Sequence, residues 1–174
     1  MDISSADDLH LALHLADLSD SLTLGAFRTK FSVRTKADQT PVSEIDEQVE
    51  KTIRAELERE RPGDAIVGEE FGNRGDSARR WIIDPIDATK NYIRGIPIFA
   101  TLIALDGRIG VVSAPGLRRR WWATKGGGAF CNGDPIGVSK VGDLKEAQIG
   151  YDSVTDFPEP EKFLALVRRC GRSR

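Results

Sequence analysis

Residues 81–92 read Trp-Ile-Ile-Asp-Pro-Ile-Asp-Ala-Thr-Lys-Asn-Tyr, an apolar run that ends in two carboxylates, Asp84 and Asp87. The hydroxyl of Thr89 follows two residues later, and a second acidic pair, Glu69-Glu70, also comes directly after a short apolar run. Carboxylates gathered at the ends of apolar strands supply the oxygen ligands that hard cations prefer. This pattern therefore indicates cation chemistry as well as a fold.

The tetrapeptide Asp84-Pro85-Ile86-Asp87 has two interpretations. Because a proline separates the carboxylates, we expect the chain to leave the strand and turn, which would aim both side chains and the Ile86 carbonyl at one point. Glu69 from a neighbouring strand end would then complete a Mg²⁺ site. The alternative is an ordinary turn, since Asp-Pro commonly starts one. For this tetrapeptide taken alone, the ordinary turn is favoured.

Thr89 and Asp46 also have two roles open to them. A helix that begins at Thr89 would direct free backbone N–H groups at the acidic cluster and bind phosphate, with Thr89 orienting a water. The simpler role for Thr89 is an N-cap, worth about 1 kcal/mol. Asp46 lies three residues after Ser43, which favours a capping box at the start of a helix. Taken alone, Lys36 and Asp38 read as exposed turn residues.

The remaining patterns predict two helices followed by a run of short strands. Helical spacing of apolar residues marks one helix over residues 5–21, capped by Ser5 and Asp8, and a second that ends near Pro62-Gly63. Strands are expected over residues 65–67, 81–83, 99–105, 109–114 and 120–124. Asp106-Gly107 predicts a hairpin, and residues 158–169 predict a last helix. This order favours the α+β class, with layered helices and an antiparallel sheet.

Composition narrows the classes of function. A chain of 174 residues fits one domain, or one domain and part of another. The net charge of −2 provides no broad electrostatic basis for binding nucleic acid. No apolar run approaches the roughly 18 residues of a spanning helix, and no secretory signal is recognised. Two distant cysteines, Cys131 and Cys170, favour a reduced compartment. We therefore expect a cytoplasmic protein with neither a nucleic-acid nor a membrane partner.

Three acidic segments together resemble the inositol monophosphatase superfamily of Mg²⁺-dependent, lithium-sensitive phosphatases. They are residues 36–43 with Asp46, residues 68–70, and residues 81–87 with Thr89 and Asn91. Their order and spacing match, and the resemblance runs from about residue 5 to the end of the chain. Residues 68–72 and 89–105 are most similar to the bacterial histidinol-phosphate phosphatase branch. Inositol-1-phosphate phosphatase is the second choice.

The resemblance implies an inositol monophosphatase-like fold and direct, in-line hydrolysis of a small phosphorylated metabolite. It implies that Asp46 and Thr89 activate the attacking water. It implies that Mg²⁺ is bound by Glu69, Asp84, Asp87 and the carbonyl of Ile86. It implies that phosphate or substrate is contacted by Glu69, Ile86, Asp87, Ala88 and Thr89, with the backbone N–H groups of the last two holding phosphate. Glu70 would lie near the metals, and a homodimer is a family expectation.

Two departures from the family pattern are visible. The family almost always has glycine where this chain has Ala88, so a methyl group is expected to crowd phosphate, or to strain the turn if φ is positive. Residues 1–174 are expected to form the N-terminal domain only, without the C-terminal domain that carries a Trp-Asp motif and a further metal-binding aspartate. A metal- and phosphate-binding fragment without turnover therefore stays open as an alternative.

Overall fold

The computed structural model describes residues 3–148, 150 and 158–170, and the chain divides into two units, Met1–Ile136 and Gly137–Arg174. The helical elements of the first unit are α1 (Ile3–Ala26), α2 (Glu44–Glu60), α3 (Thr89–Ile93) and the 3-10 turn η1 (Pro115–Leu117). Its strands are β1 (Val33–Thr35), β2 (Pro41–Ser43), β3 (Ala65–Gly68), β4 (Gly72–Arg74), β5 (Arg80–Asp87), β6 (Ala100–Leu105), β7 (Ile109–Ala114), β8 (Arg119–Thr124), β9 (Gly128–Cys131) and β10 (Asp134–Ile136).

The large sheet has the strand order β10-β9-β8-β7-β6-β5-β3-β4, and β1 pairs with β2 in a separate ribbon. The predicted α+β class is confirmed, and so is the hairpin at Asp106-Gly107, which joins β6 to β7. The sheet is mixed, however, because β3 and β5 run parallel. The short strand β4 pairs antiparallel with the outer side of β3. The chain then crosses back before β5 begins, so β5 runs in the same direction as β3. The expectation of an antiparallel sheet is corrected at this one pair.

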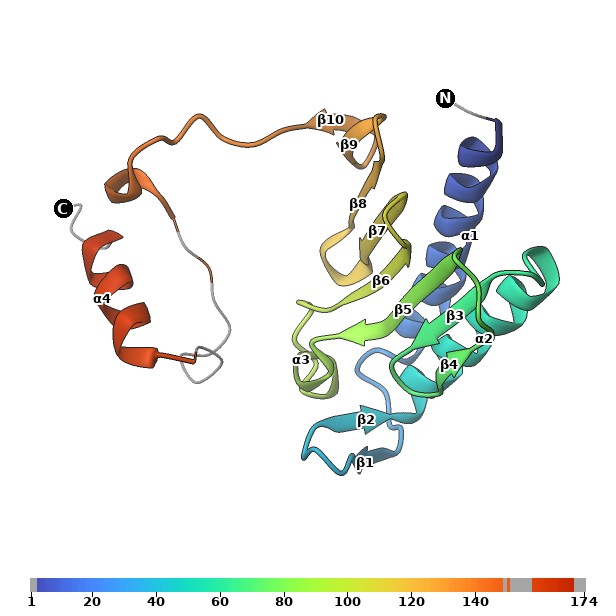
Figure 1. Cartoon of the computed structure of the whole chain (residues 1–174). Coiled ribbons are helices and arrows are strands. Elements are labelled where there is room, and N and C mark those ends of the chain that lie inside the picture. The colour runs from blue at the N-terminus through green and yellow to red at the C-terminus, as the bar shows by residue number, and fades with distance from the viewer. Residues whose placement is uncertain (1–2, 149, 151–157, 171–174) are drawn as a thin grey trace. The chain divides into compact units, whose positions relative to one another are not determined.

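Helices α1 and α2 pack against each other and cover one face of the large sheet (Figure 1). Buried and exposed side chains therefore alternate along β5. Trp81 and Ile83 are buried beneath the helices, whereas Ile82 between them is 41% exposed. The core is built from α1, α2 and the inner face of the sheet, and its largest members include Leu15, Ile53, Leu57, Ile66, Trp81, Ile103 and Leu105. The sheet therefore has one helix-covered face, and its strand ends carry the predicted site.

Both predicted helices are present, with two differences in detail. Helix α1 begins at Ile3, so Ser5 lies inside the helix and the predicted cap at that residue is wrong. Asp8 instead accepts hydrogen bonds from Arg61 and Arg79, at 2.9 and 3.0 Å. Helix α2 begins with the predicted capping box at Ser43. Asp8 therefore connects α1 to the residue that follows α2 and to the residue that precedes β5.

The second unit contains the 3-10 turn η2 (Leu144–Glu146) and helix α4 (Pro160–Cys170), which contact each other. The final helix expected over residues 158–169 is thus confirmed, and Phe163 is buried within it. The side chain of Cys170 lies outside the described residues, so the prediction made for that cysteine does too. In the described part of the chain, no helix is both long enough and apolar enough to cross a membrane.

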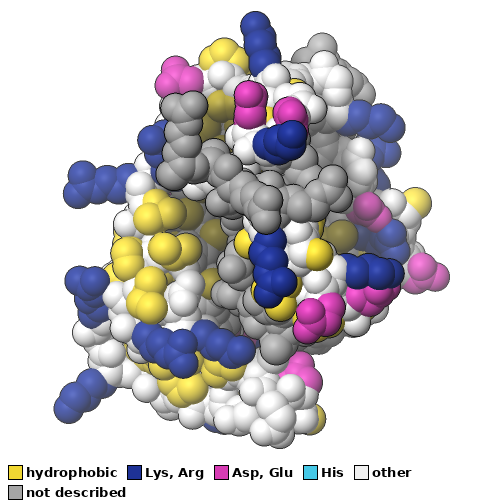
Figure 2. Space-filling model, turned by 90° about the vertical axis from the view of Figure 1, so that its left-hand side faces the viewer, with side chains coloured by type: hydrophobic (Ala, Val, Ile, Leu, Met, Phe, Trp, Pro, Cys, Tyr) yellow, Lys and Arg dark blue, Asp and Glu magenta, His cyan; other side chains and the backbone are white. Residues whose placement is uncertain are grey.

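Large apolar side chains also lie at the surface of the first unit. Ile82 and Val112 are exposed on strands of the large sheet. Ile96 and Ile98 are exposed between α3 and β6, and Leu117 is exposed in η1. On the face drawn in Figure 2, hydrophobic side chains lie among Lys and Arg side chains. Scattered exposure of this kind is common in folded proteins and by itself identifies no site.

Candidate metal and phosphate site

The two aspartates of the opening segment both belong to β5, which continues to Asp87. The prediction that they could not share a strand is wrong. The strand accommodates Pro85 through a break in register, because pairing with β6 shifts between Asp84 and Asp87. Such an irregularity suits a residue without an N–H group. The Thr101 hydroxyl donates to the freed carbonyl of Pro85 at 2.8 Å and so fixes the irregular segment.

Asp84 carries the clearest sign of an ion-binding role. Its Oδ1 atom is buried and has no hydrogen-bond partner among the described residues. Burial, and then the charge and hydrogen bonding of Glu69 together with the charges of Asp87 and Asp46, raise the pKa of Asp84 to about 8. Four carboxylates from three parts of the chain therefore act on one another here. A bound cation would compensate for the burial of this oxygen among other carboxylates.

Glu69 and Glu70 follow β3 and face a lysine that the sequence suggested was an exposed turn residue. Lys36 Nζ lies 2.7 Å from Glu69 Oε1 and 2.7 Å from Glu70 Oε1, and its side chain is only 21% exposed. Burial lowers the pKa of Lys36, but the hydrogen bonds and charges of the two glutamates outweigh it and raise that pKa above its ordinary value. Asp38, by contrast, is the exposed turn residue expected, with its Oδ1 accepting from Thr40.

Asp46 combines the capping role with a contact to the predicted catalytic threonine. Its Oδ2 atom accepts from Ser43 N at 2.8 Å, which confirms the capping box. Its Oδ1 atom accepts from the Thr89 hydroxyl at 3.3 Å, and that hydroxyl also lies 2.9 Å from the Ile86 carbonyl oxygen. Burial raises the pKa of Asp46 despite these hydrogen bonds. The structure therefore brings Asp46, Thr89 and the Ile86 carbonyl together.

Ala88 occupies the N-cap position of α3 in the left-handed conformation, with φ 63° and ψ 46°. The simpler interpretation, in which Thr89 is the N-cap, is therefore wrong. The strain expected for a residue other than glycine is present, because a β-carbon costs about 1–2 kcal/mol in this region. The sharp reversal at Ala88 leads from the end of β5 directly into α3, so the backbone of residues 88–89 adjoins the acidic cluster.

The donor set fits Mg²⁺ by its chemistry. Carboxylates and a backbone carbonyl are the ligands that a hard divalent cation prefers, and the orphaned oxygen of Asp84 supplies a partner for it. Within residues 3–148, 150 and 158–170, no three His, Cys, Asp or Glu side chains converge on one point as a ready-made metal cage. Lys36 instead engages both glutamates. A bound cation would compete with Lys36 for Glu69.

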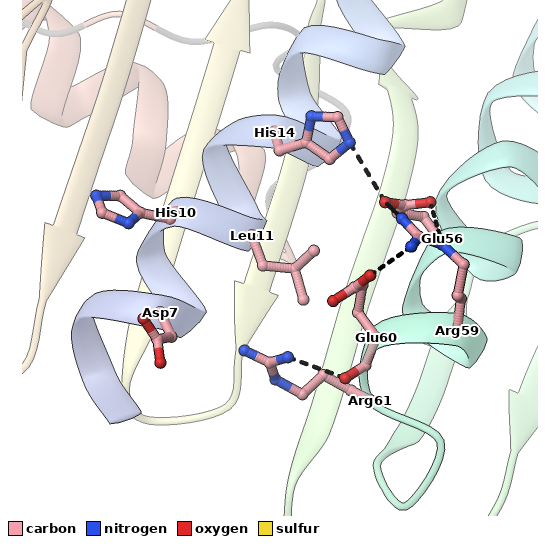
Figure 3. A pocket seen from close by; sticks show the side chains of 8 residues that line it. All are labelled: Asp7, His10, Leu11, His14, Glu56, Arg59, Glu60 and Arg61. Atoms are coloured by element: carbon pink, nitrogen blue, oxygen red, sulfur yellow. Dashed lines mark hydrogen bonds and ion pairs between the residues drawn. The ribbon is translucent and has the colours of Figure 1, made fainter. Parts of the chain in front are cut away.

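A separate groove of about 500 Å³ lies between α1 and α2, away from the predicted site residues. Figure 3 shows His14 directed at Glu56 across the groove, with His10 turned away. The contact from His14 Nε2 to Glu56 Oε1 is 3.3 Å, and Arg59 also pairs with Glu56. The groove is thus lined mainly by polar and charged side chains, and Arg59 pairs with both Glu56 and Glu60.

Known proteins are similar to this chain in sequence and in fold. Residues 9–173 match the model of the inositol monophosphatase family. A histidinol-phosphatase from Streptomyces coelicolor is 46% identical, covering 97% of this chain and 70% of that protein. One from Mycobacterium tuberculosis is 46% identical, with 98% and 71% covered. A solved inositol monophosphatase from Zymomonas mobilis superposes with a TM-score of 0.82 at 34% identity, with 97% and 68% covered.

Proposed function

Because this chain belongs to the inositol monophosphatase family, we propose that it is a Mg²⁺-dependent phosphate monoester hydrolase whose substrate is histidinol phosphate. The observation that carries the proposal is the meeting of Asp84, with its unpartnered buried oxygen, and the Asp46–Thr89 pair at the end of β5. One part can hold a cation, and the other can hold a water. Metal-assisted hydrolysis of a phosphate ester uses both.

The metal-binding residues in this proposal are Glu69, Asp84, Asp87 and the carbonyl of Ile86. When bound there, Mg²⁺ would lower the pKa of a water and neutralise charge on the phosphoryl group. Asp87 is exposed at the end of β5, where it can reach both a cation and a substrate. These ligands come from the ends of two paired strands, so the sheet sets their spacing.

Asp46 and Thr89 are the residues proposed to orient and deprotonate the attacking water. The Thr89 hydroxyl has one hydrogen, which is directed to Ile86 O or Asp46 Oδ1, so its lone pairs are free to accept a hydrogen bond from water. Burial raises the pKa of Asp46, which makes it a better proton acceptor than an exposed aspartate. The backbone N–H groups of Ala88 and Thr89 would hold the phosphate.

Histidinol phosphate is the preferred substrate because the two histidinol-phosphatases named above are 46% identical to this chain. Inositol 1-phosphate is the second candidate, supported by the fold shared with the Zymomonas mobilis enzyme. We place the reaction in histidine biosynthesis, in the cytoplasm, with a homodimer as the assembly. Residues 1–174 would form the N-terminal part of the family fold, since the chain spans about 70% of the length of these relatives.

The test is release of inorganic phosphate from histidinol phosphate and from inositol 1-phosphate, with Mg²⁺ and with Mg²⁺ removed by EDTA. We expect Mg²⁺-dependent turnover with the higher kcat/KM on histidinol phosphate. Asp84→Asn should abolish it, whereas Glu60→Gln, an exposed change on α2, should not. Equal turnover after Asp84→Asn would overturn the metal assignment. Binding of Mg²⁺ without turnover of either ester would favour a metal- and phosphate-binding fragment instead.

A further inference from the structure

Glu50 is fully buried in α2. Its carboxylate turns toward the connection between β3 and β4, which carries Glu69 and Glu70. Glu50 Oε2 accepts from the backbone N–H of Glu70 at 2.7 Å, and Oε1 accepts from the backbone N–H of Phe71 at 3.2 Å. One buried side chain therefore holds the two residues that directly follow the predicted metal ligand Glu69.

Arg54 completes the arrangement from the next turn of the same helix. Its Nε atom donates to Glu50 Oε1 at 2.7 Å, and Nη2 donates to the carbonyl of Gly72 at the other end of the connection. The Arg54 side chain is 11% exposed and that of Glu50 is not exposed at all. Because the ion pair is desolvated and each member also binds backbone, the geometry of residues 69–72 is strongly constrained.

Gly68 gives independent support for this role. A β-carbon built at Gly68 would collide with the Glu50 carboxylate and with Arg54 Nη2. Glycine at the end of β3 thus leaves the space through which Glu50 reaches the turn. The absence of a side chain at the end of β3 and the long side chains of α2 therefore fit together next to Glu69.

We propose that Glu50, supported by Arg54, is a positioning residue that holds the Glu69–Glu70 turn in the conformation required to bind Mg²⁺. This inference rests on the proposed metal site, not on turnover. Glu50 itself touches neither metal nor substrate. Groups that orient metal ligands in this way typically contribute 10- to 100-fold to metal affinity.

The test is Glu50→Gln in the whole chain, with Glu60→Gln as the matched control on α2. Binding of Mn²⁺, as a paramagnetic substitute for Mg²⁺, is measured without substrate by electron paramagnetic resonance. We expect the dissociation constant of the Glu50 variant to rise by roughly tenfold or more, and that of the control to stay within twofold. In turnover assays, the Mg²⁺ concentration for half-maximal activity should rise more than kcat at saturating Mg²⁺ falls.

Arg54→Lys serves if Glu50→Gln fails to fold, since lysine keeps a charge beside Glu50 but cannot also reach the Gly72 carbonyl in the same geometry. A folded Glu50 or Arg54 variant that binds Mn²⁺ as tightly as the wild type would overturn the inference. So would a wild-type chain that binds no Mn²⁺. A wild-type chain that binds Mn²⁺ but hydrolyses neither ester would defeat the proposed function alone and leave the positioning role testable by the same titration.

Discussion

The Thr89 hydroxyl lies 3.3 Å from Asp46 Oδ1, although the two residues are 43 positions apart in the chain. Asp46 reaches this point because the capping box fixes its side chain at the start of α2. Thr89 reaches it because the chain reverses sharply at Ala88. A local helix signal and a strained backbone conformation together build the pair proposed to orient water.

Replacing Thr89 by valine should lower kcat by about 100-fold or more, because the hydroxyl that orients the water is lost. KM should change little, since valine keeps the shape of the side chain. Thr89→Ser keeps the hydroxyl and should retain most of the activity. Steady-state kinetics with saturating Mg²⁺ measure both variants. A valine variant as active as the serine variant would contradict a catalytic role for the hydroxyl.

Replacing Ala88 by glycine should raise the free energy of unfolding by about 0.5–1 kcal/mol. Removing the β-carbon relieves left-handed strain of about 1–2 kcal/mol, and the greater freedom of glycine in the unfolded chain offsets about 0.4–1 kcal/mol of it. We also expect higher kcat/KM, because the backbone can approach phosphate more closely. Urea unfolding and phosphate release provide the two measurements.

Arg118→Gly is the matched control for Ala88→Gly. Arg118 also has a left-handed backbone, with φ 55°, and lies outside the proposed site. Its replacement by glycine should provide a similar gain in stability with no change in activity. An equal gain in kcat/KM from both variants would show that the effect of Ala88→Gly is not local to phosphate.

Replacing Asp84 by asparagine should have opposite effects with and without Mg²⁺. Without the ion, the variant should unfold about 2–4 °C higher than the wild type, because asparagine removes about 1 kcal/mol of the cost of burying Asp84, either charged or protonated, beside other carboxylates. With Mg²⁺ at 100 times its dissociation constant, the wild type should gain about 2.7 kcal/mol, and the variant should gain much less. Thermal unfolding followed by circular dichroism measures this. The same Mg²⁺-dependent shift in both proteins would argue against Asp84 as a ligand.

Replacing Asp8 by alanine should destabilise the fold by about 2 kcal/mol and lower the Tm by roughly 4–8 °C. The Asp8 side chain is only 4% exposed and pairs with Arg61 and Arg79, which would both lose their partner. The neighbouring exposed residue Asp7 provides the control, and Asp7→Ala should change the Tm little. Mn²⁺ affinity should be unaffected in either variant. A Tm unchanged by Asp8→Ala would show that the three-segment connection adds no stability.

The sequence by itself determined the helices, the strands β3 and β5 to β8, the capping box at Ser43 and the identity of the acidic segments, because each depends on neighbours within a few residues. Only the tertiary structure decided that β5 continues through Pro85, that β3 and β5 are parallel, and that Lys36 and Glu50 hold the Glu69–Glu70 turn. Those features arise from pairing and burial between segments far apart in the chain. Glu50 contacts the backbone of residues 70 and 71 only because the fold buries it against that turn, and its place in the sequence does not reveal this contact.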